Sequence, residues 1–160
     1  MNNTDPNTVN NFGDEWKRFD QGKISKEESL IIFNKYFSLF SLDNLDPNSE
    51  VFDMGCGTGR WARWVAPKVK KLNCIDPSIA IDIAKKNLSN FKNINFFNTS
   101  VDSSGLKKNS QDFGYSLGVL HHVPNTSLAI KSCVDLLKPG APLLLYLYYN
   151  FDTRPLWFRV

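Results

Sequence analysis

The sequence predicts an α/β fold, a doubly wound and mostly parallel sheet with helices on both faces. Three observations support this prediction. The 160 residues suffice for one domain with its own core. Short apolar runs alternate with helical stretches, as in parallel βαβ units, and a glycine-rich turn directly follows the first run. The expected strands are EVFDM at 50–54, KLNCI at 71–75, INFF at 94–97, DFGYSLG at 112–118 and LLLYLYY at 143–149.

Two segments precede the first strand. Residues 1–12 are mostly Asn, Thr, Asp and Pro, a composition that cannot offset its own ordering entropy, so we expect a flexible arm. Residues 13–48 are expected to form a helical lid segment, in which an amphipathic helix runs from Lys26 to Leu42 after the N-cap Ser25. The core domain is then expected over 49–160.

Two further helices are expected between the strands. The helix at 78–91 has apolar residues on one side, namely Ile79, Ile83, Ala84, Leu88 and Phe91. The helix at 126–137 starts at Asn125 or Thr126 and ends before a Pro-Gly pair, with apolar positions at Leu128, Ile130, Val134, Leu136 and Leu137. Both helices should therefore lie against the sheet.

Composition argues against several classes of function. Nineteen Lys and Arg oppose 16 Asp and Glu, and the net charge of +3 is far below the excess typical of nucleic-acid binders. The longest strongly apolar stretch, 143–149, is about a third of the ~20 residues that span a membrane. The N-terminus does not resemble a secretion signal, and the three cysteines form no CxxC pair. We therefore expect a cytoplasmic protein that binds no nucleic acid, membrane or metal.

The glycine turn indicates a ligand. The turn contains Gly55, Gly57 and Gly59, and Asp53 lies two residues before the first of them. This arrangement of strand, glycine turn and helix is typical of nucleotide binding at the carboxyl edge of a sheet. The spacing is GxGxG, and Arg60 occupies the place where a dinucleotide fingerprint has its last small residue. A carboxylate at Asp53 would repel a pyrophosphate but suits an ammonium group. The alternative is a purely structural glycine turn.

A second acid follows the second strand. Asp76, within CIDPS, comes 17 residues after Gly59 and at the end of the second strand, where a carboxylate can accept hydrogen bonds from both hydroxyls of a ribose. The alternative interpretation is a turn-forming Asp before Pro77.

In combination, these motifs resemble those of the class I, Rossmann-like S-adenosylmethionine-dependent methyltransferases, and most closely their small-molecule branch. The matching segments are VFDMGCGTGRWA, CIDPS, SLGVLHHVPN and LLKPGAPLLLYLYY, within about residues 49–149. The resemblance implies that the three glycines pass beneath the cofactor, that Asp53 faces its amino group and that Asp76 holds the ribose diol. Pro77 and Leu117 belong to the same matching segments, so they are cofactor-binding candidates as well.

The adenine contact is less clearly marked. The family often has an Asp after the third strand, followed by a small or apolar residue, and this position falls on Ser100 and Val101. Asp102 lies two residues beyond Ser100 and takes the role if the loop differs.

The rim of the expected site carries His121 and His122, the only histidines. Either can accept a proton from a substrate hydroxyl or amine, or serve a structural or cofactor-adjacent role, and the sequence does not separate the two. Trp16 and Arg18 are expected in a lid over the cofactor. Aromatic candidates near the sulfonium are Trp16, Phe19, Trp61 and Tyr115, for which core packing is the alternative.

The resulting hypothesis is an enzyme that moves a methyl group from S-adenosylmethionine to an unidentified small molecule by in-line displacement, with S-adenosylhomocysteine as the product. The alternatives are a non-catalytic module that binds either molecule and an NAD-dependent oxidoreductase of similar architecture. The family's sheet normally has seven strands, whereas five are counted here, so the C-terminal strand hairpin is lacking. The chain is therefore expected to be a piece of a longer enzyme, or to self-associate through its exposed fifth-strand edge.

Overall fold

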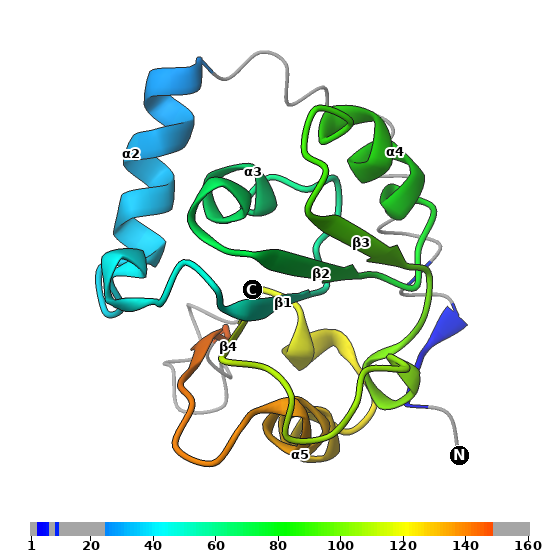
Figure 1. Ribbon diagram of the computed structural model, residues 1–160. Helices are drawn as coiled ribbons and strands as arrows, with labels where there is room; N and C mark the ends of the chain where they lie inside the picture. The colour runs from blue at the N-terminus through cyan, green and yellow to red at the C-terminus, as the bar shows by residue number, and fades with distance from the viewer. Residues whose placement is uncertain (1–2, 7–8, 10–24, 149–160) are drawn as a thin grey trace, which may run out of the picture.

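A five-stranded parallel sheet organises the chain, and the computed structural model describes residues 3–6, 9 and 25–148 (Figure 1). The strand order among these residues is β3-β2-β1-β4-β5. The strands are β1 (Glu50–Met54), β2 (Lys71–Ile75), β3 (Ile94–Phe97), β4 (Phe113–Leu117) and β5 (Leu143–Tyr146). All five predicted strands are confirmed, although β5 ends at Tyr146 rather than at residue 149.

Helices cover both faces of the sheet, as predicted for a doubly wound fold. The α-helices are α2 (Lys26–Tyr36), α3 (Ala62–Val65), α4 (Ala80–Asn87) and α5 (Thr126–Leu136). Single 3-10 turns are η2 (Leu42–Asn44), η3 (Ala66–Lys68), η4 (Val101–Ser103) and η5 (Leu120–His122). Helices α2, α3 and α4 lie on one face of the sheet, and α5 lies on the opposite face (Figure 1). The side chains of the first three helices pack in one apolar cluster, and those of α5 pack with η4 and η5 in a second.

The central strands are buried on both faces because each face has its own helix layer. On β1, Val51 faces the cluster of α2, α3 and α4, whereas Phe52 faces the α5 layer. Gly114 of β4 lies under the Phe52 ring, and a Cβ there would come within 2.1 Å of that ring. The apolar runs of the sequence therefore correspond to strands that are buried along their length, rather than to strands in which buried and exposed residues alternate.

The predicted helix from Lys26 to Leu42 is wrong in its extent. The helix ends at Tyr36, and Ser41 begins a separate 3-10 turn by accepting a hydrogen bond from the Asp43 backbone N–H. Phe33 and Phe37 anchor this segment in the core. Apolar residues that the helical spacing assigned to the same face are exposed instead, namely Leu30, Ile31 and Leu39. The predicted Ser25 N-cap is confirmed, with Glu28 completing a capping box.

The buried faces of α4 and α5 also differ in part from the prediction. Ile79, Leu128 and Val134 are exposed. On α5, the buried residues are Ala129, Cys133 and Leu136. Small side chains let the helix approach the sheet closely, and this contact determines which residues are buried. The Asn125 N-cap is confirmed, because its side chain accepts a hydrogen bond from the Leu128 N–H.

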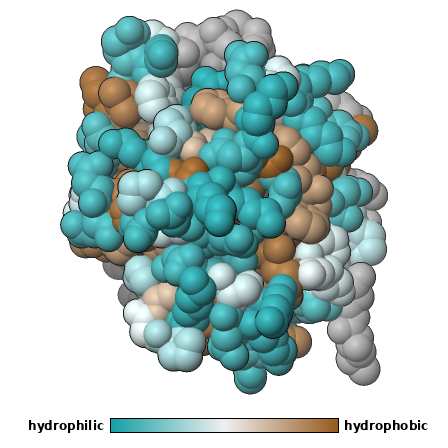
Figure 2. All heavy atoms as spheres, viewed as in Figure 1, coloured by the Kyte–Doolittle hydropathy of each residue, from teal (hydrophilic) through white to brown (hydrophobic). Residues whose placement is uncertain are grey.

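The face shown in Figure 2 is mostly hydrophilic, with apolar atoms scattered among the polar ones. The longest helices that the described ranges contain, α2 and α5, have 11 residues each. Within those ranges, no helix has both the length and the apolar character needed to cross a membrane.

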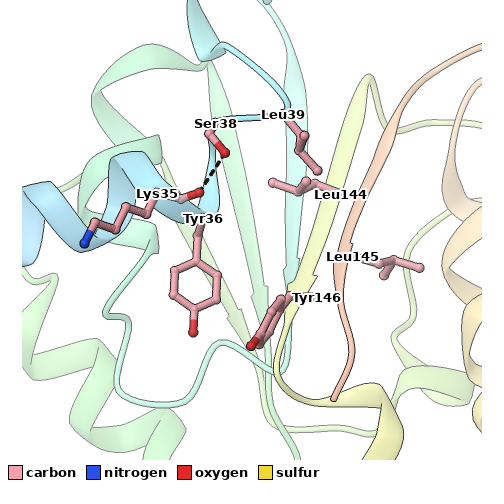
Figure 3. A pocket seen from close by; sticks show the side chains of 7 residues that line it. All are labelled: Lys35, Tyr36, Ser38, Leu39, Leu144, Leu145 and Tyr146. Carbon is pink, nitrogen blue, oxygen red and sulfur yellow. Dashed lines mark hydrogen bonds between the residues drawn. The ribbon is translucent and has the colours of Figure 1, made fainter. Parts of the chain in front are cut away.

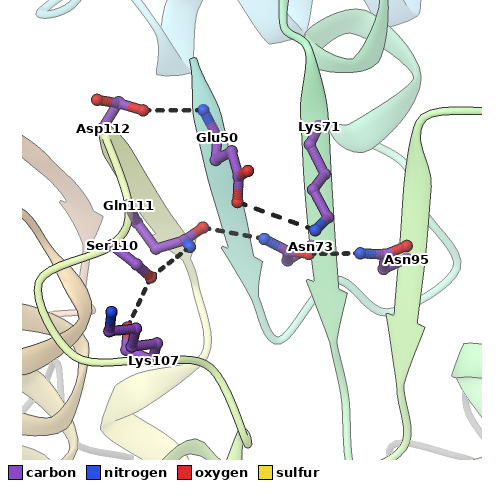
Figure 4. Close-up of polar contacts among 8 residues, drawn as sticks. All are labelled: Glu50, Lys71, Asn73, Asn95, Lys107, Ser110, Gln111 and Asp112. Carbon is purple, nitrogen blue, oxygen red and sulfur yellow. Dashed lines mark hydrogen bonds and ion pairs between the residues drawn. The ribbon is translucent and has the colours of Figure 1, made fainter. Parts of the chain in front are cut away.

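A row of buried amides crosses the sheet, and sequence reasoning did not foresee it (Figure 4). Asn95 Nδ2 donates to Asn73 Oδ1 at 3.0 Å, and Asn73 Nδ2 donates to Gln111 Oε1 at 3.0 Å. Gln111 Nε2 in turn donates to Ser110 Oγ at 2.8 Å. Asn73 and Gln111 are only 1% and 2% exposed, so their amide groups depend on these hydrogen bonds rather than on water.

We expect Gln111→Leu to lower the free energy of unfolding by about 2 kcal/mol, because it leaves the buried Asn73 amide without its acceptor. Urea unfolding followed by circular dichroism measures this change. Replacing both partners, as in Asn73→Leu with Gln111→Leu, should cost less than the two single changes together. Asn90→Leu, at an exposed position, serves as the control and should change stability by less than about 0.5 kcal/mol. An unchanged unfolding midpoint in Gln111→Leu would show that the amide row is not stabilising.

Candidate functional site

The carboxyl ends of β1 and β4 lie side by side at the point where the strand order reverses. In open α/β sheets, ligands bind in the crevice at such a switch point. The glycine turn after β1, the acid after β2 and the rim segment after β4 all reach this edge, because parallel strands end on the same side. The sequence candidates on these three segments therefore share one end of the sheet.

The glycine turn has the backbone conformation that its residues predict. Gly55, Gly57 and Gly59 have φ angles of 77°, 53° and 82°, a region in which other residues are strained. A Cβ at Gly55 would lie 2.4 Å from Val119 Cγ1, and one at Gly59 would lie 2.5 Å from Leu88 Cδ1. The glycines thus allow both the turn and the close packing of the rim segment and α4 against it.

Asp53 is the most unusual residue of the site. Its carboxyl group is buried, with 1% of the residue exposed, and no hydrogen bond reaches Oδ2 within the described part of the chain. Burial raises the pKa of Asp53 to about 8. Two smaller effects act on the same pKa: the Tyr115 hydroxyl lowers it, and the Asp76 charge raises it. An unpaired buried carboxyl group is costly, and an incoming ammonium group would satisfy it.

Asp76 holds the glycine turn and forms a turn of its own after β2. Its Oδ2 accepts a hydrogen bond from the Gly57 N–H at 2.8 Å, which fixes the glycine turn. Its Oδ1 accepts from the Ser78 N–H at 2.8 Å and from Ser78 Oγ at 2.6 Å, the pattern of a turn-forming Asp. Pro77 lies between these partners. Because each carboxylate oxygen has two lone pairs, Oδ2 retains the capacity to accept a ligand hydroxyl.

The three adenine candidates follow β3 as predicted. Ser100 Oγ donates to Asp102 Oδ1 at 2.6 Å, whereas Val101 is buried in the α5 layer. Asn3, which sequence reasoning missed, donates its backbone N–H to Asp102 Oδ2 at 3.3 Å. Burial of Asp102 opposes its ionisation, but the hydrogen bonds from Ser100 and Asn3 outweigh this effect and lower its pKa.

Asn3 also reaches the rim of the site. Its side chain donates to the Asn125 carbonyl at 2.8 Å and accepts from the Asn125 N–H at 2.8 Å. It therefore joins the loop of Asp102 to the start of α5. No sequence signal predicts a contact across 122 positions. Trp16, Arg18 and Phe19, named above as lid or aromatic candidates, lie outside the described residues.

The two rim histidines differ in their surroundings. The His121 ring lies 3.9 Å from the His122 ring and 4.4 Å from that of Tyr148, between centroids. Both ring nitrogens of His121 are buried, and no hydrogen bond reaches them from the residues that the structure describes. Burial is the larger cause of the lowered pKa of His121, and the neighbouring His122 is the smaller one. The neutral form of His121 is therefore favoured. Leu117 ends β4 just before this segment.

An aromatic row continues from His121 across the rim. We use this name for the side chains of Trp61, Tyr36, Tyr146, Tyr148, His121 and His122, in spatial order. Successive centroid distances are 4.8 Å from Trp61 to Tyr36, 5.0 Å from Tyr36 to Tyr146 and 5.5 Å from Tyr146 to Tyr148. The Arg60 guanidinium lies 4.4 Å from the Trp61 ring centroid. Trp61 is mostly buried, and Tyr115, which lies outside the row, is fully buried. Both side chains are therefore packed in the core.

A groove of about 350 Å³ lies beside the aromatic row, between the end of α2 and β5. Figure 3 shows the Tyr36 and Tyr146 side chains extending in the same direction along it. The remaining lining residues are Lys35, Ser38, Leu39, Leu144 and Leu145. This groove was not predicted, because its walls come from segments more than 100 positions apart.

A parallel sheet in this order, with a GxGxG turn after β1 and an acid after β2, defines a Rossmann-like cofactor-binding protein. The methyltransferase domain family matches residues 52–145. The chain therefore belongs to this family, as the resemblance of its motifs had indicated.

Individual relatives agree with the family. The ubiquinone biosynthesis O-methyltransferase of Coxiella burnetii strain RSA 493 is 30% identical over 95 residues, which are 58% of this chain and 41% of that one. This chain thus spans about two fifths of the length of the curated relatives it matches.

Solved structures agree on the fold. A SAM-dependent methyltransferase from Aquifex aeolicus is 17% identical with a TM-score of 0.63, and the match covers 98% of this chain and 81% of that one. The [4+2]-cyclase SpnF is 22% identical with a TM-score of 0.65, and the match covers 78% and 47%. At such identities the likeness shows the fold alone, and the cyclase illustrates that the fold hosts more than one reaction.

Proposed function

We propose that this chain binds S-adenosylmethionine and takes part in the transfer of its methyl group to an oxygen atom of a small molecule. The observation that carries the proposal is Asp53, a buried carboxyl group with an unpartnered oxygen at the switch point of the sheet. The cofactor has an ammonium group, a ribose diol and an adenine, and the residues present fit all three. The names of the matched relatives, O-methyltransferases of ubiquinone biosynthesis, support oxygen as the acceptor atom.

Each segment of the site has a distinct role in this proposal. Asp53 binds the amino group, and Asp76 binds the ribose hydroxyls while holding the glycine turn through the Gly57 N–H. Ser100, Val101 and Asp102 form the adenine side, while Gly55, Gly57 and Gly59 allow the cofactor to lie close to the backbone, with Pro77 and Leu117 beside it. The bound cofactor supplies a methyl group on a sulfonium, which is transferred in line and leaves S-adenosylhomocysteine.

The acceptor side of the site requires a base and the exclusion of water. We assign the base to His121, because its neutral form is favoured and its ring nitrogens have no partner among the described residues. It would take the proton of the acceptor hydroxyl as the oxygen–methyl bond forms. His122 packs against the His121 ring and would hold it in place.

The wider setting is also part of the proposal. All three cysteines are free and buried, which supports a reducing, cytoplasmic location. In this proposal, residues 1–12 form an arm and residues 49–160 form the core. Trp16 and Arg18 lie between these two parts in the sequence and would close over the cofactor as a lid. The described part of β5 pairs on one side only, with β4, which supports self-association through its other edge.

Titration calorimetry with S-adenosylhomocysteine and with NAD tests the cofactor assignment on the whole chain. We expect micromolar-range binding of the former and no heat from NAD. Transfer of a labelled methyl group to small molecules of a cell extract then separates an enzyme from a non-catalytic binding module. Binding of NAD in preference to S-adenosylhomocysteine would overturn the proposal, and binding without any transfer would leave only the binding function.

A further inference from the structure

We propose that Asn3 is a positioning residue for base recognition, which holds the Asp102 carboxylate in the orientation that accepts a hydrogen bond from the 6-amino group of adenine. This inference rests on the proposed function, in which residues 100–102 form the adenine side. It adds a residue from the start of the chain, far from that segment in the sequence. We call Asn3 and its hydrogen bonds to Asp102 and Asn125 the N-terminal clasp.

The clasp is anchored at the start of α5. The Asn3 side chain donates from Nδ2 to the Asn125 carbonyl and accepts at Oδ1 from the Asn125 N–H, both at 2.8 Å. One carboxamide thus pairs with both backbone groups of one residue, which requires a donor and an acceptor on the same side chain. Asn125 is itself fixed, because its side chain caps α5 by accepting from the Leu128 N–H at 2.9 Å. Asn3 is only 5% exposed, so water has little access to these hydrogen bonds.

The other end of the clasp holds Asp102. The Asn3 backbone N–H donates to Asp102 Oδ2 at 3.3 Å, and Ser100 Oγ donates to Asp102 Oδ1 at 2.6 Å. The carboxylate is therefore held at both oxygens, although Asp102 is an exposed residue. Each oxygen has a second lone pair, so the group retains the capacity to accept from a ligand. A carboxylate already held in one orientation binds a donor more tightly than a mobile one, because less entropy is lost on binding.

The chemistry of a fixed carboxylate distinguishes adenine from hypoxanthine, its 6-oxo counterpart. An ionised carboxylate only accepts hydrogen bonds, so it attracts a 6-amino group and repels a carbonyl oxygen at the same place. A site built around a hydrogen bond rejects a ligand that lacks the matching donor, because the polar group of the site is then left unpaired. The rejection weakens when the carboxylate can turn away. Loss of the clasp should therefore change the preference between the two bases more than the affinity for the rest of the cofactor.

Calorimetric titration of the whole chain with S-adenosylhomocysteine and with S-inosylhomocysteine, its hypoxanthine analogue, tests this inference. We expect the wild-type chain to bind the adenine compound about tenfold more tightly or better. Asn3→Asp keeps the size of the side chain but replaces its donor with an oxygen that faces the Asn125 carbonyl. Asn3→Asp and Asn3→Ala should each reduce the ratio of the two affinities to about threefold or less. Asp102→Asn should abolish the preference.

Asn90→Asp makes the same chemical change at an exposed position, so it is the matched control and should leave the ratio unchanged. Hydrogen exchange in the ligand-free chain provides a second measurement, which does not depend on the cofactor. The Asn125 amide donates to Asn3 Oδ1, so it should exchange faster in Asn3→Ala, which removes that acceptor.

The possible outcomes separate this inference from the proposed function. A preserved ratio in both Asn3 variants, even with weaker binding of both compounds, would show that Asn3 only stabilises the fold and would overturn the inference. A wild-type ratio near one would overturn it as well, because Asp102 would then not distinguish the bases. In both cases the cofactor assignment would stand. Failure of both compounds to bind the wild-type chain would instead overturn the proposed function, and with it any role of Asn3 toward the cofactor.

Discussion

Asp53→Asn is expected to weaken the binding of S-adenosylhomocysteine more than tenfold at pH 8.5, and by much less at pH 6. The reason is that Asp53 must be ionised to attract the ammonium group, whereas burial raises its pKa to about 8 in the free protein. At pH 6 the wild-type group is already neutral, so the amide differs little from it. Calorimetric titration at the two pH values measures the difference.

The same linkage predicts that a proton is released on binding. Near pH 7, ammonium binding converts a mostly neutral Asp53 into a carboxylate, so close to one proton should leave, and the affinity should rise with pH up to about 8. Binding enthalpies in buffers of different ionisation enthalpy give the proton count. The Asp53→Asn variant should release none.

Stability of the free chain should show the opposite trend. The folded pKa of Asp53 lies above its ordinary value of 3.8, so the folded state holds the proton more tightly than the unfolded state. This contribution is complete below about pH 4 and is lost as the pH rises to about 8. Asp53→Asn should remove that part of the pH dependence, which thermal unfolding at several pH values reports.

Asp82→Asn provides a matched control, because it removes the same charge from an exposed position on α4. It should change neither the affinity nor the proton count. If Asp53→Asn and Asp82→Asn gave equal affinities at pH 8.5, Asp53 would not be the ammonium ligand.

His121→Gln is expected to lower the rate of methyl transfer to an acceptor hydroxyl by about 10² to 10⁴, the usual range for loss of a general base. The cofactor affinity should remain unchanged, because His121 contacts the aromatic row rather than the cofactor segments. Labelled methyl transfer under saturating conditions measures kcat. The wild-type rate should fall as the pH drops through the lowered pKa of His121, because only the neutral imidazole accepts a proton.

His122→Gln separates a base from a packing residue. It should reduce kcat only a few-fold and leave the shape of the pH profile unchanged. The profile should shift modestly along the pH axis, because His122 contributes to the lowered pKa of His121. A larger loss in His122→Gln than in His121→Gln would reverse the assignment of the base.

Local patterns predicted the strands well. The runs at 50–54, 71–75 and 94–97 became β1, β2 and β3 with the same bounds, because buried parallel strands need continuous apolar sequence. Helix faces were less predictable. The apolar periodicity of the predicted helix from Lys26 to Leu42 includes Leu39, which is 86% exposed because the helix ends at Tyr36 and Leu39 lies beyond it.

The candidate site was also predictable only in part. Asp53 and Asp76 could be named from the sequence because each directly follows a strand, and parallel strands bring their carboxyl ends together. The contacts of Asn3 with Asp102 and Asn125 carried no signal, because they join positions about a hundred residues apart. Likewise, the sequence could not separate His121 from His122, since their surroundings differ only in the folded chain, where the Tyr148 ring lies 4.4 Å from the His121 ring and 6.2 Å from the His122 ring.

By itself, the sequence determined the fold class, the order of strands and helices along the chain and the positions of Asp53 and Asp76 at the ends of two strands, because these depend on short-range spacing. Only the tertiary structure decided which side chains from distant segments come together at the rim of the site. The aromatic row and the buried amide row each combine residues from distant segments. Such contacts arise from the packing of whole elements onto the sheet, and no local pattern encodes the distance between two elements that meet only in the folded chain.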